Sequence, residues 1–241
     1  MNAIEANRCA RIAGFLVLAS IFAGGFAEVY VPGRLLAPSD PAATANNIFD
    51  SATLFRASFV VYLVEAICDI TLALLFLSLL RPVSPHISML AAFFGLVSTA
   101  SFAVAELFYF TSSIPILDPD VRDHLTPDEV NIFVYVSLML YQYGGSVFMV
   151  FYGIATFLRG YLVYRSSYFP NWLGELMLIA GVGFAIKNVL VVLAPQFDSD
   201  LLLAPMFVAM ICLACWLLVK GVDQRLWPPP SSADLVSPKI E

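Results

Sequence analysis

The chain alternates long apolar runs with short polar loops, and this pattern decides its class. Six runs are each close to the ~20 residues that an α-helix needs to cross a bilayer. They cover residues 9–31, 56–80, 86–110, 130–160, 172–193 and 201–219. The pattern therefore predicts an all-α fold, a polytopic membrane protein built as a six-transmembrane-helix bundle. A short helix at residues 42–50 is expected in the first long loop.

Composition supports the membrane interpretation independently. Hydrophobic residues make up 60% of the chain and charged residues only 12%, with a mean hydropathy of +0.85. A soluble domain could not cover so much apolar surface, so lipid must cover it. The net charge of -6 and the lack of a basic stretch argue against a nucleic-acid partner. We expect one transmembrane domain over residues 1–221, with an outer loop at 32–55, and a flexible cytoplasmic tail at 222–241.

Lysine and arginine positions predict the orientation, because short cytoplasmic loops retain positive charge. If the N-terminus is inside, only Arg34, Arg56 and Arg122 lie on the outer side. The inner segments then hold Arg8, Arg11, Arg81, Arg159, Arg165, Lys220, Arg225 and Lys239. Both termini are therefore predicted to be cytoplasmic.

Ionisable side chains inside the predicted spans are the main functional signal, because charge in hydrocarbon is costly unless it has a partner or water. At ~1.5 Å per residue, these positions lie roughly 5 to 18 Å from the outer boundary, all in one half of the membrane. An outward-facing polar cavity that ends near the midplane is the simplest interpretation. Its candidate lining residues are Glu28, Arg56 at the mouth, Glu65, Asp69, Glu106, Gln142 and Lys187.

The charges of this predicted cavity do not balance, because four acids face two bases. Glu65 and Asp69 are four residues apart and share one helix face. Lys187 is expected to pair with one of them, and Arg56 to meet Glu28 or the outer loop. With two bases for four acids, two carboxyl groups are left without an internal partner. These groups must be protonated, hydrated or neutralised by a bound cation. The alternative interpretation is a set of interhelical ion pairs that only fix the packing.

Other chemistry is weakly indicated. Cys212 and Cys215 have a redox spacing, although cysteines in membrane spans are usually packing residues. His86 and His124 fall on opposite sides of the membrane, so no shared metal site is expected. Neither a metal nor a cofactor is predicted. Glu175 is expected to pair with Arg159 or Arg165 near the inner surface.

Short strings in order along the chain carry a family resemblance. They include Arg11-Ile-Ala-Gly14, Phe26-Ala-Glu28, Pro41-Ala-Ala-Thr44, Asn47-Ile48, Leu54-Phe-Arg56, Cys68-Asp69, Leu79-Leu-Arg-Pro-Val83, Gly160-Tyr-Leu162 and Pro170 to Gly174. From about Arg11 to Leu193 the chain resembles the bacterial multi-pass family catalogued as domain of unknown function 4386. The resemblance implies a prokaryotic inner-membrane protein and supplies no activity. It also implies recurrent polar positions at Arg11, Glu28, Thr44, Asn47, Arg56 and Asp69, whereas Lys187-Asn188 stands where an acid is expected.

Three functions from different classes remain open on the sequence. The leading hypothesis is binding or transport of a small polar or cationic solute, with Glu65 and Asp69 as the acidic pair. A membrane-embedded enzyme that acts on a lipid or isoprenoid is the first alternative, with the same carboxyl groups as acid and base. A non-catalytic partner of another membrane protein is the second. The bilayer is the one certain partner, and a homo-oligomer is left open.

Overall fold

The computed structural model describes residues 1–37, 40–197 and 199–228. Every regular element in this part of the chain is a helix. Six helical segments are long and apolar enough to cross a membrane, which confirms the predicted all-α bundle. The predicted cytoplasmic position of the termini stays a prediction.

Each span begins or ends beyond its predicted apolar run. The first comprises α1 (Ala3–Gly24), the π-helix η1 (Gly25–Tyr30) and α2 (Val31–Leu35). The others are α4 (Ala52–Leu80), α5 (Pro85–Thr111) with α6 (Ile114–Leu117), α8 (Pro127–Arg165), α9 (Asn171–Leu193), and η3 (Asp200–Leu203) with α10 (Ala204–Val219). The connections contain α3 (Pro41–Asp50), α7 (Pro119–Arg122) and η2 (Pro195–Phe197), and α3 confirms the predicted short helix.

Polar caps explain the extra length of two of these helices. Asn2 and Glu5 form a capping box at the start of α1, and Thr126 and Glu129 form another at the start of α8. Such caps satisfy the free amide groups of the first turn, so a helix can start well before its apolar stretch.

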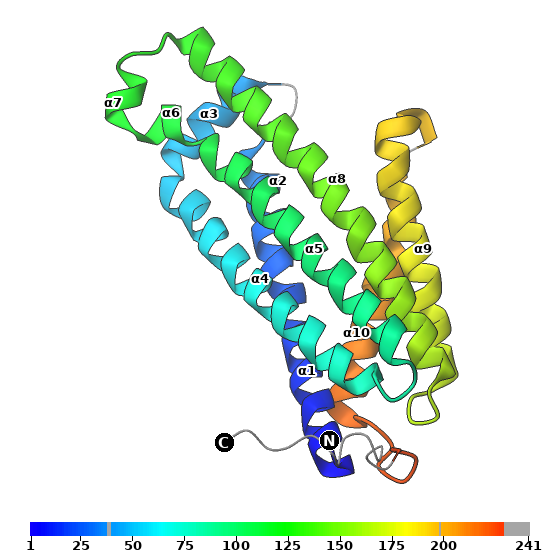
Figure 1. The fold of residues 1–241 in the computed structure, drawn as a ribbon. Helices are drawn as coiled ribbons and strands as arrows, with labels where there is room; N and C mark the ends of the chain where they lie inside the picture. The colour runs from blue at the N-terminus through cyan, green and yellow to red at the C-terminus, as the bar shows by residue number, and fades with distance from the viewer. Residues whose placement is uncertain (38–39, 198, 229–241) are drawn as a thin grey trace.

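The helices run lengthwise between two distinct ends of the molecule (Figure 1). Helices α3, α6 and α7 lie together at one end, which we call the loop end. The N-terminus lies at the other, the terminal end. There Trp227 Nε1 donates to the Met1 carbonyl (3.2 Å), and Asp223 N donates to the Tyr168 carbonyl (3.2 Å). The first residues of the predicted tail thus pack against the bundle, while residues 229–241 lie outside the described residues.

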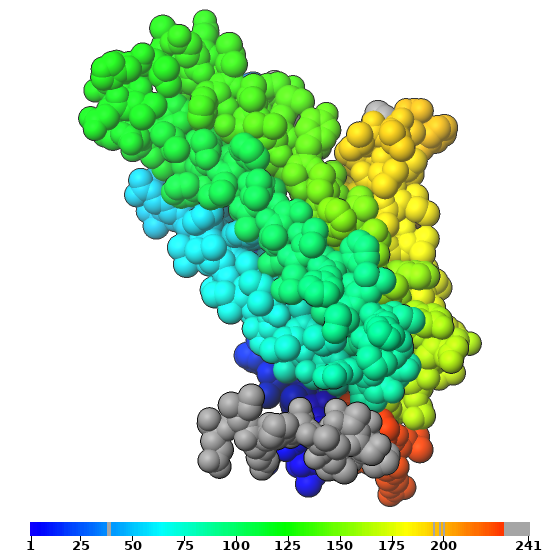
Figure 2. Space-filling model, viewed as in Figure 1, coloured from blue at the N-terminus to red at the C-terminus, as the bar shows by residue number. Residues whose placement is uncertain are grey.

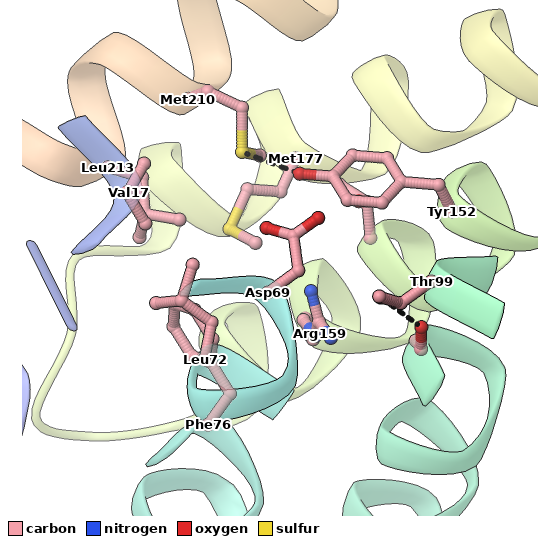
Figure 3. Close-up of a pocket in the computed structure, with 12 residues that line it drawn as sticks. Val17, Asp69, Leu72, Phe76, Thr99, Tyr152, Arg159, Met177, Met210 and Leu213 are labelled. Atoms are coloured by element: carbon pink, nitrogen blue, oxygen red, sulfur yellow. Dashed lines mark hydrogen bonds between the residues drawn. The ribbon is translucent and has the colours of Figure 1, made fainter. Parts of the chain in front are cut away.

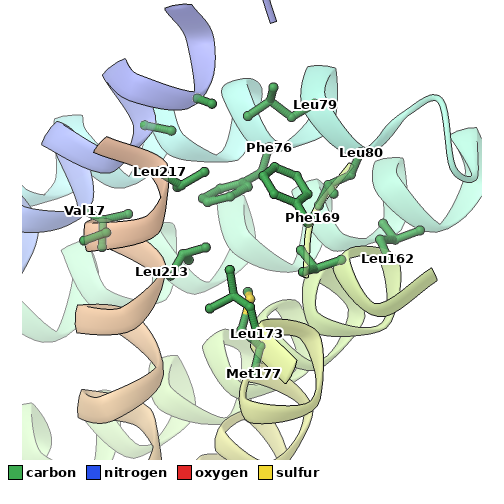
Figure 4. Packing of buried hydrophobic residues seen from close by; sticks show 14 of the residues in the cluster. Val17, Phe76, Leu79, Leu80, Leu162, Phe169, Leu173, Met177, Leu213 and Leu217 are labelled. Atoms are coloured by element: carbon green, nitrogen blue, oxygen red, sulfur yellow. The ribbon is translucent and has the colours of Figure 1, made fainter. Parts of the chain in front are cut away.

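Glycines let α8 and α9 cross at very close range towards the terminal end. A Cβ atom on Gly153 would lie 2.8 Å from the Gly181 carbonyl oxygen, and one on Gly160 would lie 2.8 Å from Met177 Cβ. Nearby, Phe76, Leu173, Leu213 and other apolar side chains form the largest buried cluster (Figure 4). Small residues at such crossings favour helix association in a membrane, where dispersion contacts replace the hydrophobic effect.

Towards the loop end the bundle divides. Helix α8 stays with α5, whereas α9 and α10 lean away, and the space-filling view shows the surface hollowed between α8 and α9 (Figure 2). A second apolar cluster fills the loop end between α2, α3, α4, α5, α6 and α8. Helix α3 covers it and is held by Asn47 Nδ2, which donates to the Leu35 carbonyl (3.2 Å), and by Thr44 Oγ1, which accepts from Ala37 N (2.9 Å). The interior between the two apolar clusters is where the polar side chains gather.

Candidate functional site

Three glutamates from three segments meet inside the bundle, and we call them the carboxyl cluster: Glu28 on η1, Glu65 on α4 and Glu106 on α5. The Glu28 and Glu65 carboxyl groups lie close enough to interact with each other. Glu106 is only 4% exposed, and it lies close enough for its charge to act on both. Asp69, one turn further along α4, completes the set of four acids.

Helix geometry brings Glu28 and Glu65 together. Glu28 lies on a π-helical segment that interrupts the first span, and π-helical turns widen a helix and re-aim its side chains, often at functional sites. The residue facing Glu65 on α1 is Gly24, where a Cβ atom would lie 2.8 Å from Glu65 Oε1. A side chain at residue 24 would therefore compete with the Glu65 carboxyl group for space.

Aromatic side chains line the cluster. The Tyr141 side chain on α8 lies near the Glu106 carboxyl group and interacts with it. Tyr62 is 1% exposed and packs edge-on against Phe102, with 4.5 Å between ring centroids. Within the described residues, the Tyr62 hydroxyl, Glu28 Oε1 and Glu65 Oε2 are buried without a hydrogen-bond partner. Buried polar atoms without partners are costly, so these groups need a proton, a water molecule or a ligand as a partner.

A small cavity lies next to the cluster, towards the terminal end. Asp69 and Arg159 line it from α4 and α8, together with Thr99 and Tyr152 (Figure 3). Its volume is about 20 Å³, which admits a water molecule and nothing much larger. Asp69 Oδ1 accepts a hydrogen bond from Ser20 Oγ on α1 (3.1 Å).

Asp69 and Arg159 face each other without direct contact. Each charge acts on the other, yet among the described residues no ion pair within 4.0 Å joins Asp69 to Arg159. The cavity thus separates a buried acid from a buried base. An ordered water fits between them and would satisfy both groups.

Comparison with known proteins gives a family. The model of a family described as a domain of unknown function (DUF4386) matches residues 12–221. The chain belongs to the DUF4386 family. An uncharacterized protein of the archaeon Archaeoglobus fulgidus is 33% identical over 159 residues, which is 64% of this chain and 78% of the relative. No solved structure matches.

All four acids and Arg159 lie within the part that matches the DUF4386 model. The family assignment confirms the resemblance inferred from the sequence. Because this relative is archaeal, similarity to this chain is not confined to bacteria. A bacterial origin and the inner membrane stay predictions.

Two predicted cavity residues of this DUF4386 chain lie away from the carboxyl cluster. Arg56 and Gln142 are both exposed. Gln142 directly follows Tyr141, whose side chain lies near Glu106. Because consecutive helical residues point about 100° apart, the Gln142 side chain points in another direction. Lys187 is half-buried on α9, which packs mainly against α8 and α10. Its pairing with Glu65 or Asp69 stays a prediction.

Arg159 is a candidate site residue that the sequence pattern did not place inside the bundle. It was expected on the inner side near the membrane surface, yet it is 8% exposed inside the bundle. Helix α8 continues to Arg165, so Arg159 lies more than one turn before its end. Glu175 is exposed and makes no ion pair with Arg159 or Arg165 among the described residues, so that predicted pairing is wrong.

No group of three or more His, Cys, Asp or Glu side chains in the described ranges is arranged to hold a metal ion. The four cysteines Cys9, Cys68, Cys212 and Cys215 are free thiols. The chemistry that the cluster offers is therefore that of neighbouring carboxyl and phenol groups, which bind and share protons.

Proposed function

We propose that this protein is a proton-linked membrane transporter, in which the carboxyl cluster exchanges protons for a small cationic solute. The observation that carries the proposal is the meeting of Glu28, Glu65 and Glu106 from three segments inside the bundle, where Glu28 Oε1 and Glu65 Oε2 are buried without a hydrogen-bond partner in the described residues. A proton on one carboxyl group would let it donate a hydrogen bond to a neighbouring one.

Electrostatics supports the same conclusion. Two unit charges of like sign about 4 Å apart repel by roughly 4 kcal/mol at an effective dielectric constant near 20. Glu28, Glu65 and Glu106 lie together in a membrane interior, and the cation that faces this region, Arg159, lies beyond Asp69. The three glutamates cannot all be ionised at once, so the cluster holds protons that a cation can displace.

The packing indicates which step of such a cycle the structure represents. Apolar clusters close the interior at the loop end and towards the terminal end, and the cavity between them admits only water. We assign this conformation to the proton-loaded, closed state. A solute would enter after the helices separate, and the division between α8 and α9 is where the bundle is already open on one side (Figure 2).

Proteoliposomes with an acidic interior and a trapped pH dye test this proposal. External sodium, potassium and tetramethylammonium chlorides are added in turn, and the interior pH is followed. At least one cation is expected to make the interior more alkaline, and Glu65→Gln should abolish the response. Glu175→Gln, an exposed glutamate outside the cluster, is the matched control. A response that survives Glu65→Gln, or none with any cation, contradicts the proposal.

A further inference from the structure

The polar groups inside the bundle form a continuous series with one closed end. From the loop side the series runs through Glu106, Glu28 and Glu65, then Asp69 and the water-sized cavity, and ends at Arg159. Beyond Arg159 lies a second hollow lined by Ala73, Phe76, Leu77, Leu80, Ser88, Ala91 and Ala92, and it has no room for water. A fixed positive charge therefore stands where the polar series meets the apolar core.

Arg159 is held in place on several sides. Gly95 on α5 makes room for its head, because a Cβ atom there would lie 2.5 Å from Arg159 Nη2. The guanidinium carbon lies 5.4 Å from the centre of the Phe76 ring, within cation–π range. Its Nε atom is buried without a hydrogen-bond partner in the described residues. The titratable groups that face it are Asp69 and Tyr152.

We propose that Arg159 is an electrostatic barrier that stops protons and other cations from passing between the carboxyl cluster and the terminal end. A fixed cation in a narrow, weakly screened passage repels other cations, as charged residues do in selective pores. The carboxyl cluster then loads and unloads from one side while the bundle is closed. This inference rests on the proposed function, since it concerns the protons of that cluster.

Passive proton leak through reconstituted protein tests the barrier. Proteoliposomes carry a trapped pH dye, and a potassium diffusion potential set by valinomycin drives protons inward. Arg159→Gln should raise the leak at least about tenfold over wild type, equivalent to a barrier lower by about 1.4 kcal/mol. Arg159→Lys keeps the charge and should leak as little as wild type. The matched control is Arg165→Gln, which removes an exposed arginine from the same helix.

A second variant moves the charge without removing it. Gly95→Ala should push the guanidinium group aside and raise the leak to a level between wild type and Arg159→Gln. Gly145→Ala is its control, because no atom lies within 4 Å of a Cβ atom at that position. If Arg159→Gln does not yield a monodisperse helical protein, Gly95→Ala decides the question.

The outcomes separate the two proposals. A folded Arg159→Gln protein that leaks no more than wild type, or an equal leak in Arg165→Gln, overturns the barrier. The cation-exchange assay above is unaffected by that result, so the carboxyl cluster keeps its proposed role. If Arg159→Gln leaks and adding Glu65→Gln does not reduce the leak, the protons do not pass through the carboxyl cluster, and the barrier between the cluster and the terminal end is overturned. The cation-exchange assay alone decides the proposed function.

Discussion

The Glu65 carboxyl group lies directly against Gly24, so close that a Cβ atom on Gly24 would come within 2.8 Å of Glu65 Oε1 and 3.2 Å of Glu65 Cδ. At this contact α1 has no side chain, and the partly buried carboxyl group of Glu65 on α4 fills the space. This arrangement places Glu65 beside Glu28, four residues after Gly24. The glycine has a steric role here, because its backbone is ordinary right-handed helix.

Replacing Gly24 by alanine should therefore affect the site more than the fold. Alanine is favoured over glycine inside a helix by up to ~1 kcal/mol, and the group it meets is the movable end of a long side chain. We expect thermal stability in detergent equal to or above wild type, together with weaker Glu65-dependent cation–proton exchange. Gly145→Ala, which meets no neighbouring atom, should leave exchange unchanged. A large loss of stability in Gly24→Ala would show that the glycine serves packing alone.

Asp69 and Arg159 should be energetically coupled across their cavity. In a double-mutant cycle of Asp69→Asn and Arg159→Gln, each single change leaves a buried charge without its counter-charge, and the double variant removes both. We expect a coupling of about 0.5–3 kcal/mol in unfolding free energy. Additive effects within about 0.5 kcal/mol would mean that the two charges do not sense each other.

The same cycle applied to Lys187→Met tests the pairing predicted from the sequence. If Lys187 pairs with Glu65 or Asp69, the cycle should show a coupling in unfolding free energy between Lys187 and that acid. Because α9 packs against α8 and α10, we expect any such coupling to be smaller than that between Asp69 and Arg159. A larger value would place Lys187 in the site.

The predicted orientation can be tested by labelling single cysteines in intact cells. Asp120 and Ser167 are both exposed, near α7 and just after α8 respectively. In a chain whose four native cysteines are replaced by alanine or serine, Asp120→Cys should react with a membrane-impermeant thiol reagent. Ser167→Cys should react only after the cells are opened. The reverse labelling pattern would mean that the loop end, and with it the start of the polar series, faces the cytoplasm.

Hydropathy was sufficient to predict the six spans, because a bilayer demands long apolar helices whatever their neighbours are. Depth along the helices also placed Glu28, Glu65, Asp69 and Glu106 in one half of the membrane, and in the structure these four acids lie close enough to interact. The depth of a residue in the membrane does not determine the direction in which its side chain points around the helix axis. Gln142 therefore has a suitable depth yet points outward, while Tyr141 beside it reaches Glu106.

Arg159 shows a different limit of sequence reasoning. An arginine near the end of an apolar run is normally assigned to the membrane surface, where its charge meets water. Here Gly95 on another helix leaves space for the guanidinium group, and Phe76 and Asp69 provide its surroundings. These partners come from α4 and α5, so only the packed structure shows that the charge lies inside. The π-helical turn beneath Glu28 is likewise without a sequence signal beyond Gly24-Gly25.

Infrared spectroscopy of the membrane-reconstituted protein tests the central claim most directly, because protonated and ionised carboxyl groups absorb at separate frequencies. At neutral pH a free glutamate with its ordinary pKa near 4.3 is ionised, so a protonated-carboxyl band reports a proton held by the interior. Wild type is expected to show this band, and it should fade as the pH rises, since the proton is then released. Glu28→Gln and Glu65→Gln should each reduce it, and Glu175→Gln should not. A spectrum without a protonated carboxyl group at neutral pH, or a band that persists unchanged in both cluster variants, would contradict the shared proton.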